Sequence, residues 1–398
     1  FRSYNSLKFN QAGYLNTAIG VNALRENLGG NQNFAGGVNA LLKNTEGFKN
    51  TAVGAGLFIT KGAKLNAVGT ATSPIVFTSD NAPGSRNKGD WGGVILLGKA
   101  SYNVNGGLNN IEGIAASADT EYGGGSTPDD NDNSGTLKYV RIEFGGYVYA
   151  ANQEINGLTF GAVGRGTTID YVQVSHANDD SFEWFGGTVN CKHLVAFRGL
   201  DDDFDTDNGY SGNVQFILGV RDPQVSDNPV VSTSEGFESD NNASSTAVSP
   251  YTSAIFTNCT MVGPYYRIGL PNGGTIASGY KRGARIRRNS QLKIYNSVFT
   301  DYLEGVHIDG LTTETNALNG TLQFRNNLIA GTVTTAYGAY ITAPGFGTTK
   351  VALWTNDVTI GTATAYSLLA MDNNKNVVSI APYSGGSATY VLTWNGTT

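Results

Sequence analysis

The stretch DDSFEWFGGTVNCKHLVAFRGLDDDFDTDNG, residues 179–209, holds two copies of one pattern. The segment SFEWFGG, which begins at Ser181, aligns with DFDTDNG, which begins at Asp203. In each copy a phenylalanine is followed by a carboxylate, and the side chains alternate between two faces as they do along a β-strand. Copies that stack about 4.8 Å apart form the coils of a solenoid, so the stretch predicts a right-handed parallel β-helix.

Two later segments, GFESDNN from Gly236 and GVHIDG from Gly305, extend this alignment. Two columns are predicted to point into the core, namely Phe182, Phe204, Phe237 and Val306, then Trp184, Thr206, Ser239 and Ile308. Two columns are predicted to point outward, namely Glu183, Asp205, Glu238 and His307, then Phe185, Asp207, Asp240 and Asp309. The turns before the first two copies add Asp179, Asp180, Asp201 and Asp202 to the outward side. The alignment therefore predicts an acidic face along the solenoid.

The composition agrees with an all-β protein that has many turns. Apolar residues make up 40% of the chain, charged residues only 15%, and 53 of the 398 residues are glycine. Short apolar runs such as GDWGGVILLG, residues 89–98, recur between turn residues, and no amphipathic helix is indicated. A β-sandwich is the alternative arrangement for strands of this kind.

Charge and hydropathy exclude two classes of protein. The net charge of −6 argues against a nucleic-acid partner, which would require a basic surface. No run approaches the 18 or so apolar residues that a membrane span requires. The two cysteines, Cys191 and Cys259, predict buried free thiols rather than a disulfide framework.

The first 58 residues carry a repeat of their own. Asn10, Asn27 and Asn44 recur 17 residues apart, and the glycines of the same segments recur with them. A unit this short buries no core alone, but stacked units do. We therefore predict stacked β repeats over residues 1–58, the β-helix over residues 59–340 and a β-rich cap over residues 341–398. Because the chain begins within a repeat, more sequence is expected upstream.

Stacked carboxylates repel one another, so the acidic face needs an explanation. Solvated loops that spread the carboxylates apart would provide one. Bound Ca²⁺, which takes six to eight oxygen ligands, would provide another. The candidate metal ligands are Asp179, Asp180, Asp201, Asp202, Asp203, Asp205, Asp207, Glu238, Asp240 and Asp309.

A catalytic carboxylate pair with one raised pKa is the third explanation. The acid/base candidates are Glu183, Asp205 and Glu238. The basic segment GYKRGARIRRNSQ, residues 279–291, supplies Arg285 and Arg287, which either bind an acidic sugar or neutralise the acidic face. Phe185 and His307 are the remaining candidates for ligand contact, with Phe185 as an exposed ring beside carboxylates.

Four segments resemble a group of secreted or cell-surface right-handed β-helix proteins of bacteria that use type IX secretion. These segments are GDWGGVILLGKA (89–100), DDSFEWFGGTVN (179–190), DDDFDTDNGYSGNVQF (201–216) and RRNSQLKIYNSVF (287–299), and the resemblance covers residues 57–330. It implies a pectate-lyase-like fold but no reaction. Separately, the NTAIG repeats of residues 1–58 resemble those of phage tail fibres and of trimeric autotransporter adhesin heads.

The sequence thus predicts an extracellular structural or adhesive module at the cell surface. Its acidic, calcium-binding face would contact a surface glycan, and assembly into a homo-oligomer through residues 1–58 would accompany it. A calcium-dependent polysaccharide lyase or glycoside hydrolase is one alternative. A phage-type receptor-binding fibre is the other.

Overall fold

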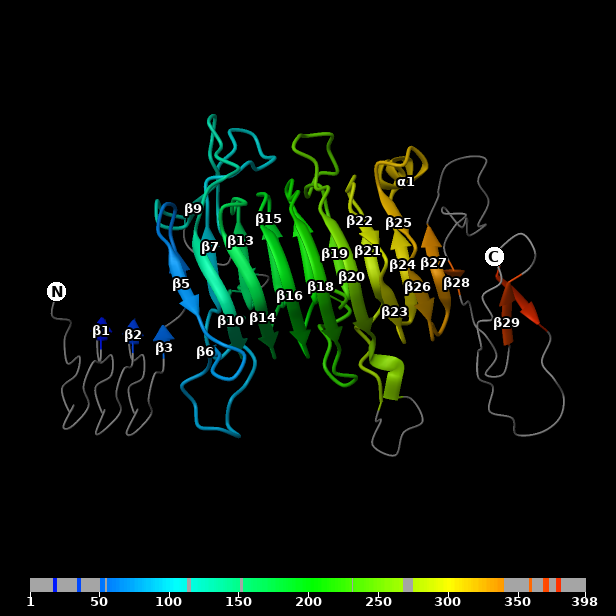
Figure 1. The fold of residues 1–398 in the computed structure, drawn as a ribbon, viewed down its shortest axis with the longest axis horizontal. Coiled ribbons are helices and arrows are strands. Elements are labelled where there is room, and N and C mark those ends of the chain that lie inside the picture. The colour runs from blue at the N-terminus through cyan, green and yellow to red at the C-terminus, as the bar shows by residue number, and fades with distance from the viewer. Residues whose placement is uncertain are drawn as a thin grey trace.

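The computed structural model describes residues 56–112, 116–150, 153–230, 232–267 and 275–339, together with six short strands outside these ranges. Most strands belong to two long parallel sheets, which run side by side along the molecule (Figure 1). Over residues 57–330, each coil contributes one strand to one sheet, called sheet B, and then one or two strands to the other, called sheet A. The fold is therefore the all-β parallel β-helix that the aligned segments predict.

Sheet B forms one face of the solenoid. Its strands in spatial order are β4 (Leu57–Ile59), β7 (Val94–Leu97), β13 (Leu158–Gly161), β15 (Phe182–Phe185), β17 (Phe204–Asp207), β19 (Phe237–Ser239), β21 (Arg282–Ile286), β24 (Glu304–Ile308) and β27 (Thr335–Ala339).

Sheet A forms the rest of the wall. Its main path is β1 (Thr17–Ile19), β2 (Phe34–Gly36), β3 (Thr51–Val53), β6 (Ile75–Phe77), β10 (Gly135–Glu143), β14 (Thr168–Ser175), β16 (Asn190–Phe197), β18 (Asn213–Val220), β20 (Ile255–Val262), β23 (Val298–Thr300), β26 (Leu328–Ala330) and β28 (Val358–Thr359). The short strands β5 (Leu65–Val68), β22 (Lys293–Tyr295) and β25 (Gln323–Arg325) extend it.

A bend divides the strands of sheet A into two halves. The residue at the bend has a φ angle between 51° and 59° in every case, and these residues are Tyr139, Tyr171, His193, Phe216, Asn258, Asn296 and Asn326. Left-handed backbone is unfavourable for bulky residues. The aromatic members offset this by stacking, with ring centroids 4.6 Å apart for Tyr139 and Tyr171 and 4.1 Å apart for Tyr171 and His193. The bend gives the solenoid three faces rather than two.

The core consists of the inward columns that the alignment predicts. Phe182, Phe204 and Phe237 are in register and fully buried, and neighbouring ring centroids lie 5.3 Å apart. In the next inward column, Thr206 Oγ1 donates a hydrogen bond of 2.8 Å to Ser239 Oγ, which satisfies two buried hydroxyls. The predicted alternation is confirmed over these three coils.

The sequence alignment placed the fourth segment, GVHIDG, in the coil directly after that of Phe237, but the segment lies one coil further along the solenoid. β21 lies between β19 and β24, so Glu238 is in register with Arg285, and Arg285 in turn with His307. The sequence pattern predicts no strand over residues 279–291. Ala284 and Ile286 are nevertheless buried and fill the inward positions of a strand there, while the arginines point outward.

The 17-residue period appears in the N-terminal strands. β1, β2 and β3 pair in parallel, with Thr17 opposite Phe34 and Phe34 opposite Thr51. β3 then pairs with β6, so these strands continue sheet A. Most of residues 1–58, including the segments predicted to mediate oligomer assembly, lies outside the described residues, as does most of residues 341–398, where β29 (Leu368–Met371) and β30 (Val377–Ile380) form a hairpin.

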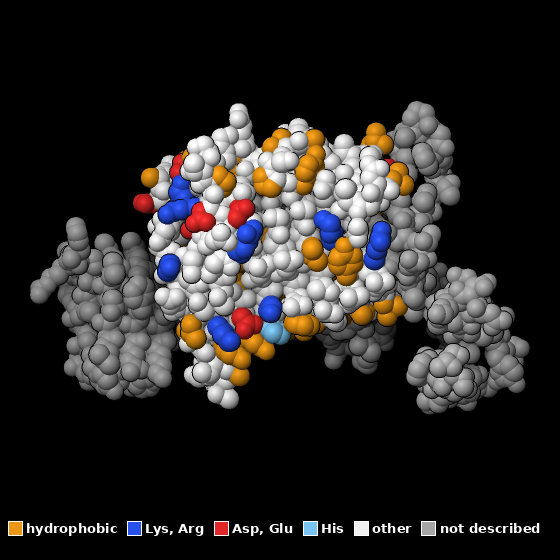
Figure 2. All heavy atoms as spheres, turned by 45° about the horizontal axis from the view of Figure 1, so that its top comes forward, with side chains coloured by type: hydrophobic (Ala, Val, Ile, Leu, Met, Phe, Trp, Pro, Cys, Tyr) orange, Lys and Arg blue, Asp and Glu red, His pale blue; other side chains and the backbone are white. Residues whose placement is uncertain are grey.

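Loops and small elements project from the solenoid. They include the hairpins β8 (Asn109–Asn110) with β9 (Glu121–Tyr122) and β11 (Val148–Ala150) with β12 (Gln153–Glu154), the 3₁₀ turn Pro264–Arg267 and helix α1 (Leu311–Leu318). Among the described residues, no helix has the length and apolar character that crossing a membrane requires. Charged side chains are sparse on the face that Figure 2 shows. Both cysteines are buried free thiols, as predicted.

Candidate functional site

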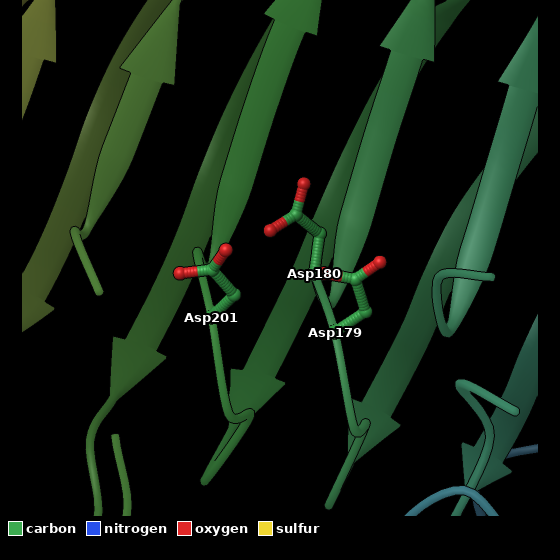
Figure 3. Close-up of side chains that lie close together, drawn as sticks. All are labelled: Asp179, Asp180 and Asp201. Atoms are coloured by element: carbon green, nitrogen blue, oxygen red, sulfur yellow. The ribbon is translucent and has the colours of Figure 1, made fainter. Parts of the chain in front are cut away.

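Carboxylates gather where the strands of sheet B begin. Asp179 and Asp180 precede β15, and Asp201 occupies the equivalent turn before β17 (Figure 3). Asp180 Oδ1 accepts a hydrogen bond of 2.8 Å from the backbone N–H of Asp202. Asp202 Oδ1 accepts in the same way from the N–H of Glu235 on the following coil. One oxygen of Asp180 and one of Asp202 therefore tie neighbouring coils together.

The carboxylates form one continuous cluster. Three sets each place ligand oxygens within 4.8 Å of one another, and these sets are Asp179, Asp180 and Asp201, then Asp180, Glu183 and Asp205, then Asp202, Asp205 and Glu238. Because Asp180 and Asp205 each belong to two sets, the sets overlap along the solenoid axis. We refer to these seven residues as the acidic cluster. Its spacing follows from the stacking of β15, β17 and β19.

A groove of about 830 Å³ opens over much of this cluster. Its described lining includes Asp179, Asp180, Glu183, Asp201 and Asp205 together with uncharged Asn156, Asn178 and Ser232, and it includes no lysine or arginine. The groove also receives Val148 and Val230 from neighbouring loops. A divalent cation in the groove would therefore lie close to oxygen atoms from several coils at once.

Several oxygens in the groove are buried without a partner. Within the described part of the chain, Oδ1 of Asp201, of Asp205 and of Asn156 is inaccessible and accepts no hydrogen bond. The Asn156 side chain is held in place because its Nδ2 donates to Glu183 Oε2, and only 2% of Asn156 is exposed. An unsatisfied buried acceptor destabilises the fold unless a ligand, ion or water compensates it.

Burial and mutual repulsion raise the pKa values of the cluster. Burial is the largest cause for Asp180, Glu183 and Asp205, and neighbouring carboxylates add to it, so their pKa values lie well above the ordinary range. Burial likewise raises the pKa of Asp201 to about 7, with a further contribution from Asp227. Without a cation, the cluster therefore retains protons near neutral pH.

The other end of the acidic face is neutralised by the basic segment. Arg287 pairs with Glu238 and, at 2.8 Å, with Asp240. Arg285 pairs with Asp309 at 2.8 Å, and its other nitrogen lies 3.6 Å from Glu238. Of the two roles considered for these arginines, the contacts correspond to neutralisation of the face. Asp240 and Asp309 thus pair with guanidinium groups, although the sequence indicates both as candidate metal ligands.

Three predicted site residues lie elsewhere than expected. Asp203 is fully buried and pairs at 2.7 Å with the equally buried Arg221, so it does not belong to the outward face. Phe185 is not the exposed ring that the sequence predicts, because the loop that carries Tyr122 covers it and leaves 7% of it exposed. His307 is buried as well, with Nδ1 3.0 Å from Glu304 Oε2.

Sequence reasoning missed Asn156 and Asn178. The register of Leu158 with Phe182 places Asn156 in the same column as Asp180. Extending the alignment back one coil to EINGLTF, residues 154–160, would have found it. Asn178 directly precedes the first aspartate pair, but it has no distinguishing sequence signal because asparagine is common in turns throughout the chain.

The comparisons with known proteins agree with this architecture. A family described as "Pectate-lyase like beta helix domain" matches residues 27–389. The chain belongs to this family. No curated protein and no solved structure matches the chain significantly. The cluster of this pectate-lyase like beta helix domain is thus interpreted from its own geometry.

The oxygen-rich arrangement suits a hard divalent cation. Ca²⁺ accepts carboxylate and amide oxygens in flexible geometry, and both kinds line the groove. Transition metals that prefer nitrogen or sulfur ligands are less suited, since His307 lies apart and both cysteines are in the core.

Proposed function

We propose that the protein is an extracellular β-helix module that binds Ca²⁺ in the acidic groove and attaches, through the loaded face, to an acidic surface glycan. The observation that carries the proposal is the combination of overlapping carboxylate sets with buried, unpartnered oxygens. A bound cation would satisfy those oxygens and replace the protons. It would also offset most of the carboxylate charge, so that a sugar carboxylate could complete the coordination of the cation.

A binding role is favoured over catalysis by two features. Ligand oxygens that lie within 4.8 Å of one another in each set suit the coordination of a shared cation. A lyase would need a free base, but Arg285 and Arg287 are both engaged by carboxylates. We therefore interpret the groove as a cation-binding site, called the ion cage below, rather than as a catalytic acid/base pair.

Thermal unfolding with calcium and with a chelator tests the proposal. A ligand that binds only the native state stabilises it by RT ln(1 + [L]/Kd), or about 2.7 kcal/mol at a hundredfold excess over Kd. We expect calcium to raise the midpoint clearly. The double variant Asp180→Asn with Asp205→Asn should lose this shift, and because an amide oxygen can still accept the Asp202 N–H, the coil contact should survive.

The matched control is Asp119→Asn, an exposed aspartate outside the groove, which should retain the full shift. Binding of oligogalacturonate, measured by calorimetry, should then depend on calcium in the wild type and in the control. The absence of any calcium-dependent shift would contradict the ion cage. Calcium-dependent cleavage of that oligomer would replace the binding role with the enzymatic one.

A further inference from the structure

A second hollow lies at the opposite edge of sheet B, where the strands end. Two loops rise from the solenoid there, residues 101–112 and 116–128 with the β8–β9 hairpin and residues 240–251 between β19 and β20 (Figure 1). They enclose a pocket of about 470 Å³, which is within the roughly 300–1,000 Å³ typical of small-molecule sites. Its floor is formed by Phe185 and Asp207 at the ends of β15 and β17.

The walls of the pocket are held together by side-chain hydrogen bonds. Asn103 Nδ2 donates to the backbone oxygen of Asn241 at 2.7 Å and so joins the two loops. Asn242 Oδ1 accepts hydrogen bonds from the backbone N–H groups of Ser244 and Thr246, at 3.1 Å each. A wall fixed in this way loses little conformational entropy when a ligand binds.

Two polar groups of this wall still have unused bonding capacity. Tyr102 Oη accepts hydrogen bonds from Tyr122 Oη at 3.2 Å and from Asn109 Nδ2 at 3.1 Å, so its own proton is available to a further acceptor. Asn103 is only 2% exposed, and its Oδ1 has no hydrogen-bond partner among the described residues. A ligand hydroxyl can accept the Tyr102 proton, whereas Asn103 Oδ1 is inaccessible and marks an unmet acceptor beside the pocket.

The lining selects for an uncharged, hydroxyl-rich ligand. Amides dominate it, with Asn103, Asn105, Asn109, Asn110, Asn208 and Asn242 as members. Val104 and Val248 supply apolar surface for the carbon face of a ring. No lysine or arginine is among the described lining residues, and the carboxylates of Glu112 and Asp207 would repel an anion. An acidic sugar is therefore disfavoured in this pocket.

We infer that this pocket binds a neutral sugar, such as the terminal or branch residue of a glycan chain. The pocket shares Glu112 with the lining of the acidic groove, but its other lining residues differ, and the inference does not depend on calcium. Neutral amides donate to and accept from sugar hydroxyls at the same time, which a purely acidic surface does not do.

The test blocks the pocket by a substitution that removes no hydrogen bond. Ala243 is exposed and lines the pocket, so Ala243→Trp fills it. Ala247 lies on the same loop, is equally exposed and is not part of the lining, so Ala247→Trp is the matched control. The probes are neutral tetrasaccharides of glucose, mannose or xylose at millimolar concentration, and binding is followed by ligand-observed NMR in the presence of a chelator.

We expect at least one probe to bind the wild type and Ala247→Trp, with at least tenfold weaker binding to Ala243→Trp. Binding that survives Ala243→Trp, or no binding of any probe, would overturn the assignment. The calcium shift of Ala243→Trp should remain intact, whereas Asp180→Asn with Asp205→Asn should lose that shift and keep neutral-sugar binding. These two readouts separate failure of the pocket from failure of the ion cage.

Discussion

Substitution of Asp201 by asparagine should stabilise the protein when calcium is absent. Asp201 lies in the acidic cluster, and its pKa is raised from 3.8 to about 7, first by burial and then by Asp227. Asparagine has nearly the same shape but no charge. The variant therefore removes repulsion without opening a cavity.

The magnitude follows from the pKa difference between the folded and unfolded states. Each pKa unit corresponds to about 1.36 kcal/mol, so the charged Asp201 carboxylate destabilises the folded state by on the order of 4 kcal/mol at alkaline pH. The pKa of Asp201 is higher in the folded state than in the unfolded state. The free energy of unfolding of the wild type is therefore undiminished by this residue below about pH 4, and it falls as the pH rises toward 7. The advantage of Asp201→Asn should thus be largest at pH 8 and vanish near pH 4.

Urea unfolding in a chelator, followed by tryptophan fluorescence, measures this difference. Trp184 is fully buried in the core and reports its exposure. With saturating calcium the order should reverse, because the wild type offers a charged carboxylate where the variant offers only a neutral amide oxygen. A variant that is no more stable than the wild type at pH 8 in the chelator would refute the view that the cluster is repulsive without a cation.

Two further predictions concern residues outside the cluster. Arg287→Gln should destabilise the fold by about 1–3 kcal/mol in urea unfolding at pH 7, because Glu238 and Asp240 lose their shared partner and retain only Arg285 and Arg288. No measurable change would contradict this. His193→Val should lower the thermal midpoint more than His193→Asn, since both lose the ring stack on Tyr171 but only the β-branched residue is strongly strained at φ 52°. Equal midpoints for the two variants would show that the bend carries no such strain.

Repetition made much of the fold predictable. Phe182, Phe204 and Phe237 occupy equivalent places in successive coils, and a stacked fold requires equivalent residues to have equivalent neighbours. The acidic cluster was predictable for the same reason, because Asp180 and Asp202 repeat with those phenylalanines. The sequence alignment did not detect β21, because its outward arginines do not match the aligned pattern although its inward residues are small or apolar.

The sequence alone determined which side chains share a column, and therefore that carboxylates accumulate on one face. Only the tertiary structure decided which of them are neutralised. Arg221 reaches Asp203 inside the solenoid, and Arg287 reaches Asp240 across a coil boundary, while the groove around Asp205 has no lysine or arginine in its described lining. Only the tertiary structure likewise shows that loops cover Phe185 and form the amide-lined pocket. Columns follow from periodicity along the chain, but charge pairing and enclosure depend on distances between segments that periodicity does not encode.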